Sequence, residues 1–152
     1  MARYDRDALK FFAGFERIGY TNPHTPLKAG FEDIGSYLIA FVSNTAYHNE
    51  KTVNVYWVGV RYTVIPHLEV TGAYYGYRQN AYGTGKLAGC GTSVSSTCSG
   101  RFEAYSLDAD YHFNKRFDAY LGAMYSGVHN GVASGYLNTT NINPTLGVRY
   151  KF

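Results

Sequence analysis

Asp108, Asp110 and His112 are the residues of this chain whose types and spacing most readily suggest chemistry. Alternate residues of a β-strand lie on one face, so two carboxylates and an imidazole can meet there. Such a set suits a metal ion or acid–base catalysis, but a polar wall in contact with water uses the same residues. Ser106, a possible nucleophile, is about 20 Å from His112 along the strand. We therefore favour the polar wall and expect no enzyme activity, no metal site and no cofactor.

The two cysteines, Cys90 and Cys98, have seven residues between them. Two cysteines in an exported protein favour a disulfide, here one that pins a loop. A zinc site would need further His or Cys ligands close by, and the neighbouring sequence supplies none. The sequence therefore predicts a disulfide between Cys90 and Cys98.

The elements that position these residues are β-strands, which period-two alternation of apolar and polar residues predicts. In residues 105–113, for example, Tyr105 and Leu107 alternate with Ser106 and Asp108. We expect six strands of roughly ten residues, the length that a barrel wall needs. The six predicted strands are Lys10–Tyr20, Thr52–Tyr62, Leu68–Asn80, Tyr105–Phe113, Phe117–Tyr125 and Pro144–Phe152.

The composition narrows the class of protein. Aromatic residues make up 17% of the chain, Tyr alone occurs 16 times, and charged residues make up only 16%. This balance excludes a disordered chain and disfavours a helical bundle. Tyr has an apolar ring and a hydroxyl that binds water, so an excess of Tyr suits the boundary between hydrocarbon and lipid headgroups. The net charge of +3 is dispersed along the chain, which argues against nucleic acid as a partner.

The connections alternate in length between the predicted strands. Residues 62–68 and 114–116 form tight links, whereas residues 21–51, 81–100 and 130–143 form long links rich in Gly, Ser, Thr and Asn. Short turns at one end and long loops at the other are typical of outer-membrane barrels. We assign Asp33–Thr45 to a folded long loop, because a further wall strand there would break this alternation. The prediction is an all-β, transmembrane, antiparallel up-and-down β-barrel, present as a partial strand array in a single domain of residues 1–152.

The polar face of such an array would line water. The charged and titratable residues that we expect to line a pore are Glu16, Arg61, Asp108, Asp110, His112, Asp118, Arg149 and Lys151. Fixed charges in a pore set its ion preference, and the small net positive charge favours anions. Alternatively, these groups are paired with one another and have no influence on ions.

Several stretches together resemble the general porins of Gram-negative bacteria, of the type found in betaproteobacteria such as Burkholderia. The resemblance covers nearly the whole chain, and its most specific part is the end, where Val148, Tyr150 and the terminal Phe152 look like the signal that outer-membrane assembly machinery reads. The matching stretches are Leu9–Glu16, Asn44–Tyr47, Trp57–Tyr62, Ala73–Tyr75, Ala109–His112, Lys115–Asp118, Ala123–Ser126, Gly131–Tyr136 and Tyr150–Phe152.

The resemblance implies a trimeric barrel of about 16 strands in the outer membrane, through which small hydrophilic solutes and ions diffuse passively. It also implies contact with outer-membrane lipid, with lipopolysaccharide and with the barrel assembly machinery. This chain corresponds to about the last six strands, shows no secretory signal in its polar first residues, and lacks the upstream loop that narrows the pore. A non-conducting outer-membrane barrel, truncated or formed by small oligomers and with a structural or interaction role, is the alternative.

Overall fold

The computed structural model describes residues 1–21, 30–34, 37–42, 49–84, 89–90, 97–133 and 138–152. The described residues fold into β-strands joined by turns and loops. None of them belongs to a helix long and apolar enough to cross a membrane. The strands are β1 (Ala2–Arg6), β2 (Leu9–Tyr20), β3 (Gly30–Ile34), β4 (Tyr37–Val42), β5 (Lys51–Ile65), β6 (Leu68–Gln79), β7 (Gly100–His112), β8 (Phe117–Asn130) and β9 (Thr140–Tyr150).

Seven of these strands form one antiparallel sheet in the order β1-β2-β5-β6-β7-β8-β9. Within this sheet each strand pairs with the strands that precede and follow it along the chain, which is the up-and-down arrangement. Strands β3 and β4 pair only with each other and form a separate two-stranded sheet within the β2–β5 connection. The all-β, antiparallel, up-and-down prediction is therefore confirmed, whereas the sheet itself is open.

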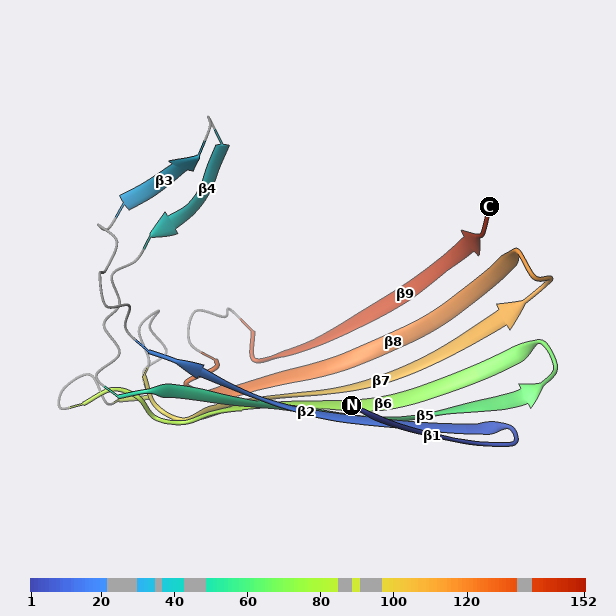
Figure 1. The fold of residues 1–152 in the computed structure, drawn as a ribbon, viewed down its shortest axis with the longest axis horizontal. Helices are drawn as coiled ribbons and strands as arrows, with labels where there is room; N and C mark the ends of the chain where they lie inside the picture. The colour runs from blue at the N-terminus through green and yellow to red at the C-terminus, as the bar shows by residue number, and fades with distance from the viewer. Residues whose placement is uncertain (22–29, 35–36, 43–48, 85–88, 91–96, 134–137) are drawn as a thin grey trace.

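The two ends of the sheet differ in their connections (Figure 1). Residues 7–8, 66–67 and 113–116 form short turns at one end, where the C-terminus also lies. The connections of residues 21–50, 80–99 and 131–139 lie at the other end. We call these the turn end and the loop end. The alternation of connection lengths that the sequence predicts is present.

Local chemistry explains the short turns. Asp7 has a φ of 50° in the β1–β2 turn, a left-handed conformation that Asp adopts more readily than most residues. In the β7–β8 turn, the Asn114 side-chain oxygen accepts hydrogen bonds from the backbone N–H groups of Arg116 and Phe117, at 2.9 and 3.0 Å. Such Asx turns hold a reversal without help from the rest of the fold.

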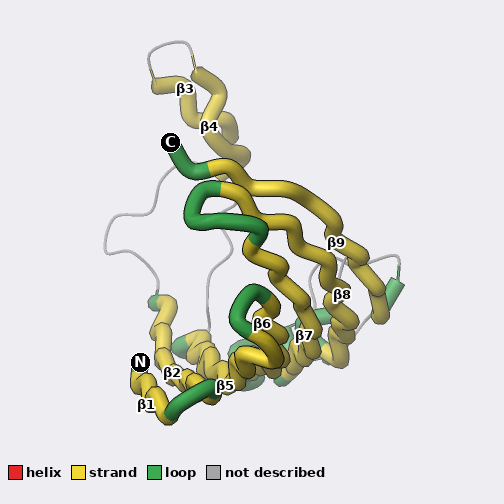
Figure 2. Tube along the Cα trace, turned by 90° about the vertical axis from the view of Figure 1, so that its right-hand side faces the viewer, coloured by secondary structure: helices red, strands yellow, loops and turns green. Residues whose placement is uncertain are grey.

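The sheet is a single curved layer, which Figure 2 shows from its side. A soluble domain buries an apolar core between at least two layers. Among the described residues, the only buried apolar side chains are Val53, Cys98, Ala104 and Val128. The sheet therefore has almost no core of its own.

The structure corrects three details of the prediction. The sheet contains seven strands and not six, because the polar segment Ala2–Arg6 pairs with β2 as β1. Within Asp33–Thr45, residues 37–42 are strand β4, although they stay outside the seven-stranded sheet as expected; residues 35–36 and 43–45 lie outside the described part of the chain. Four strands are also longer than predicted: β5 extends to Ile65, β7 begins at Gly100, β8 ends at Asn130 and β9 begins at Thr140.

Aromatic rings lie over glycines of neighbouring strands on both faces, and on the face of Tyr74 the pair is Tyr56 over Gly76. A Cβ atom at Gly14 would overlap the Trp57 ring, and one at Gly59 would overlap the Phe12 ring. Tyr120 covers Gly147 in the same way. Rings that lie flat over glycines shield the backbone and fix the strand register.

Candidate functional site

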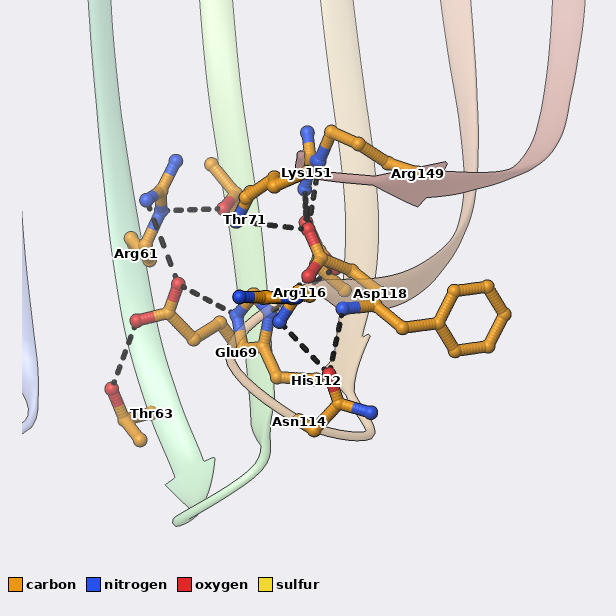
Figure 3. A network of polar contacts seen from close by, with 12 residues as sticks. Arg61, Thr63, Glu69, Thr71, His112, Asn114, Arg116, Asp118, Arg149 and Lys151 are labelled. Carbon is orange, nitrogen blue, oxygen red and sulfur yellow. Dashed lines mark hydrogen bonds and ion pairs between the residues drawn. The ribbon is translucent and has the colours of Figure 1, made fainter.

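The charged side chains at the turn end of one face form the candidate site. Register places Lys10 beside Arg61, Glu69 beside Asp110, and His112 beside Asp118. Arg149 of β9 lies opposite Asp118. We call this set, completed by Lys151, the ion-pair network. Figure 3 shows how six of its side chains meet across the strands, namely Arg61, Glu69, His112, Asp118, Arg149 and Lys151.

Asp118 is the centre of the network. Asp118 is fully buried, yet its Oδ2 atom contacts two cations. Arg149 Nε and Nη2 both lie 2.7 Å from this oxygen, and Lys151 Nζ lies 3.3 Å from it. Because charge-assisted hydrogen bonds to guanidinium are short and strong, Arg149 holds this carboxylate in a fixed orientation.

Arg149 also joins a second carboxylate to the network. Its Nη2 atom lies 2.6 Å from Asp110 Oδ2. The opposite oxygens, Asp110 Oδ1 and Asp118 Oδ1, are buried and accept no hydrogen bond. They lie 3.8 and 3.4 Å from His112 Nδ1. The imidazole thus has a carboxylate on either side of one ring nitrogen.

Glu69 extends the network toward β2 and β5. Its Oε2 atom lies 3.6 Å from His112 Nε2 and 3.5 Å from Arg61 Nη1, and its Oε1 atom lies 3.4 Å from Lys10 Nζ. Lys10 and Arg61 are direct cross-strand neighbours, and like charges in that position repel. Glu69 offsets this repulsion, because it contacts both cations.

Three residues of the network could together hold a metal ion. The ligand atoms of Asp110, His112 and Asp118 all lie within 4.8 Å of one another. Two carboxylates and one imidazole suit a divalent transition metal. However, both carboxylates already contact Arg149, and that pairing satisfies most of their charge. The geometry therefore fits an ion-pair network better than a metal centre.

All eight residues predicted to line a pore belong to the same face by register. Arg61, Asp110, His112, Asp118, Arg149 and Lys151 come together in the network. Asp108 lies next to the network without an ion pair among the described residues, and Glu16 lies about 20 Å away toward the loop end. Sequence reasoning missed Lys10 and Glu69, for which the signal was the placement of Glu69 two residues after the turn at residues 66–67.

The opposite face is apolar and carries two rows of aromatic residues. At the loop side, Tyr74 pairs with Tyr105, and Tyr105 pairs with Tyr125; Phe15 and Tyr56 continue this row. At the turn end, the row consists of Tyr4, Phe11, Tyr62, Tyr111, Phe117 and Tyr150. Aliphatic residues such as Leu107, Leu121 and Leu146 lie between the rows and are 61–80% exposed.

Exposure is inverted relative to a soluble strand. On β7, the exposed positions include Tyr105, Leu107 and Tyr111, whereas the alternate residues Asp108 and Asp110 are half-buried. In a soluble sheet the apolar side chains would be the covered ones. The polar face is therefore the sheltered side of the curved sheet, and the apolar face is open to its surroundings.

The end of the chain belongs to the apolar face. Val148 and Tyr150 are exposed there, and the Tyr150 and Phe152 rings pack edge to face with centroids 5.5 Å apart. The Lys151 N–H donates to the Arg116 carbonyl at 2.8 Å, so the β8–β9 pairing continues past Tyr150. The three residues predicted as an assembly signal thus lie on the apolar face at the end of the last strand of the sheet. That the barrel assembly machinery recognises them stays a prediction.

Cys90 and Cys98 are joined by a disulfide, with Cα atoms 5.2 Å apart. The Cys98 carbonyl accepts a hydrogen bond from Gln79 Nε2 at 3.1 Å. Next to it, the Gly131 N–H donates to the Ser99 carbonyl at 3.1 Å. The disulfide therefore ties its loop to the loop ends of β6 and β8.

Comparisons with known proteins identify no relative. No protein-family model, no curated protein and no solved structure matches this chain.

Proposed function

We propose that this chain forms part of the wall of a porin-type barrel in the outer membrane, and that small hydrophilic solutes and ions diffuse passively along its polar face. The inverted exposure of the two faces carries the proposal. An apolar outer face and a polar inner face are what a strand wall between hydrocarbon and a water-filled lumen requires.

The dimensions of the apolar face support this function. Tyr105 and Tyr111 of β7 mark the two aromatic rows, and six residues of strand span about 20 Å. Barrel walls carry an apolar band about 25 Å tall with aromatic residues at both edges. A tyrosine ring fits these edges because its hydroxyl reaches water while the ring stays in hydrocarbon.

Closure of the barrel needs strands beyond these seven. Strands β1 and β9 both run toward the turn end, so closing this sheet on itself would place them side by side in parallel. Moreover, even barrels of about eight strands are filled by side chains. A conducting, fully antiparallel wall therefore takes an odd number of strands in addition to these seven, whereas copies in one orientation would join through parallel seams.

Within the lumen, most charges cancel one another. The network pairs Arg149 and Lys151 with Asp110 and Asp118, and pairs Glu69 with Lys10 and Arg61. Paired charges contribute little to the potential that passing ions experience. Asp108 lacks an ion pair within the described part of the chain, so we propose that it biases the pore toward cations.

The resemblance to general porins completes the proposal. It adds lipid and lipopolysaccharide as surroundings, the barrel assembly machinery as the reader of Val148, Tyr150 and Phe152, and a homotrimer as the assembled state.

Single-channel recording tests the proposed function. The refolded chain is added to a planar bilayer under a salt gradient, and protease protection measures its insertion separately. We expect stepwise currents whose frequency rises more steeply than linearly with protein concentration, because closure needs more than one copy. Asp108→Asn should move the reversal potential toward anions, whereas Lys115→Gln in the β7–β8 turn should leave it unchanged.

Silence at every concentration, from protein that is demonstrably inserted, would overturn conduction by copies of this chain. That outcome would favour the alternative, a non-conducting outer-membrane sheet with a structural role, which the same apolar face would serve equally well.

A further inference from the structure

A line of basic residues crosses the apolar face at the loop end. Arg17 pairs with Asn54, Asn54 with Arg78, Arg78 with Arg101, and Arg101 with His129. Because directly paired residues point to the same side of a sheet, all five belong to the apolar face. We call this line the arginine row.

The arginine row lies just beyond the aromatic row. Along β2 and β5, Arg17 and Asn54 follow Phe15 and Tyr56 by two residues toward the loops. Two residues of strand correspond to about 7 Å. The guanidinium of Arg78 also lies over the Tyr56 ring, with 5.9 Å between the guanidinium carbon and the ring centroid. The cations therefore stand at the border of the apolar belt.

The row has too few acids to neutralise it. Arg78 faces Arg101 directly, and like charges in this position destabilise a sheet. Two acids lie near the row: Glu103 contacts Arg101 at 3.2 Å and lies 4.0 Å from His129, and the Glu50 carboxylate lies beside Gly19 on the face of Arg17. Among the described residues, neither Arg17 nor Arg78 has a carboxylate partner, and both side chains are exposed.

An anion with an apolar body would complement this arrangement. Guanidinium groups bind phosphate oxygens in pairs with matched geometry. Neighbouring strands are about 4.8 Å apart, so Arg78 and Arg101 can reach one phosphate together. A phosphate there would relieve their repulsion, and apolar tails attached to it would extend along the exposed apolar face.

We propose that the arginine row binds the phosphate group of an anionic lipid in the membrane leaflet on the loop side. This inference rests on the proposed function, since it requires the apolar face to contact hydrocarbon. The phosphate lies between Arg78 and Arg101, Arg17 adds charge on the β2 side, and the acyl chains lie over the Tyr74–Tyr105–Tyr125 row. The pairing of Arg101 with Glu103 limits the row to one strongly held headgroup.

Spin-labelled lipids test the proposal. The full chain is refolded into phosphatidylcholine vesicles that contain trace spin-labelled phosphatidylglycerol or spin-labelled phosphatidylcholine. Lipids in contact with protein give a motionally restricted component in the electron paramagnetic resonance spectrum. The size of this component for the neutral lipid reports insertion, and the ratio between the two lipids reports selectivity for the anionic headgroup.

The variant Arg78→Gln/Arg101→Gln should lower this selectivity at least about twofold, since each basic residue near an anionic headgroup contributes strongly to its binding. The control Arg3→Gln/Lys51→Gln removes the same charge from the polar face and should retain the selectivity. Salt at about 1 M, where screening acts within a few ångströms, should abolish it in the wild type.

Unchanged selectivity in Arg78→Gln/Arg101→Gln, or an equal loss in the polar-face control, would overturn the lipid site, because net charge alone would then explain any preference. Failure of the lipid contact on which the proposed function depends looks different. The restricted component would then be missing for the neutral lipid as well, in the wild type and in both variants.

Discussion

The two faces of the seven-stranded sheet treat charge in opposite ways. On the polar face, Arg149 lies 2.6 and 2.7 Å from two carboxylates, and Asp118 at its centre is buried. On the apolar face, Arg78 stands opposite Arg101, and the nearest acid contacts only one of the two. The first set is complete within the chain. The arginines of the apolar face need an anion from outside the chain. This difference indicates that the two faces meet different surroundings.

Aromatic rings repeat this contrast. On the polar face, Phe12, Trp57 and Tyr120 cover glycines of neighbouring strands, and on the apolar face Tyr56 covers Gly76 in the same way. On the apolar face, Tyr105, Tyr125 and Tyr150 project outward and are 45–55% exposed. Rings that close gaps serve packing, whereas rings in exposed rows serve an interface.

Replacing Leu121 by Arg should have the largest effect on stability. Leu121 is 61% exposed on the apolar face, and an arginine near the middle of a bilayer costs about 2–4 kcal/mol. Met124→Arg places the same charge on the polar face of the same strand and should cost far less. Urea-induced unfolding from lipid vesicles measures both. An equal loss of unfolding free energy in the two variants would contradict the assignment of Leu121 to lipid and Met124 to water.

Gly59→Ala should have the next largest effect, because its Cβ would overlap the Phe12 ring. Overpacking of this kind costs about 1–3 kcal/mol. Gly72→Ala is the matched control on the apolar face, since a Cβ there meets nothing within 4 Å. Equilibrium unfolding of the two variants under the same conditions should separate them. A neutral Gly59→Ala would show that the ring does not lie over this glycine.

Asp118→Asn should lower the urea midpoint by a smaller amount. Arg149 and Lys151 lose their shared anion, but both are about half exposed, so water replaces part of that interaction. Asp108→Asn removes the same charge from a residue outside the ion pairs and should leave the midpoint almost unchanged. A larger loss from Asp108→Asn than from Asp118→Asn would contradict the network.

Replacing both cysteines by Ser should have the smallest global effect, because the disulfide lies in a loop outside the sheet. Its loss should loosen the loop locally, so the amides of Tyr82 and Gly131, which donate to Thr97 and Ser99, should exchange faster with deuterium. The amide of Thr63, which donates to Ala8 at the turn end, is the internal control. Equal acceleration at both ends would mean that the disulfide stabilises the whole sheet.

Most of the sheet could be predicted from the sequence, because alternation along a strand is a local signal. It identified six strands and the faces of Leu121 and Leu146. Alternation did not identify β1, because the charged residues Arg3 and Asp5 give this edge strand the composition of a polar terminus. It also missed β4, since an apolar run such as residues 37–42 carries no alternation.

The network was only partly predictable. The three-residue turn at 114–116 already implies that His112 faces Asp118. Grouping His112 with Asp108 and Asp110 of its own strand leaves this signal unused. The contact of Lys10 with Glu69 joins β2 to β6 across β5. This contact depends on the register of three strands, two of which are joined by the long connection of residues 21–50. No local sequence pattern therefore predicts the contact.

Labels on neighbouring residues of β8 test directly whether the apolar face contacts lipid and the polar face contacts water. Single cysteines at Ala119, Tyr120, Leu121 and Met124, in a chain with Cys90 and Cys98 replaced by Ser, would each carry a fluorophore in refolded protein. We expect brominated lipid to quench the labels at 119 and 121 and aqueous iodide to quench those at 120 and 124. Equal quenching of neighbouring positions by either agent would contradict this expectation.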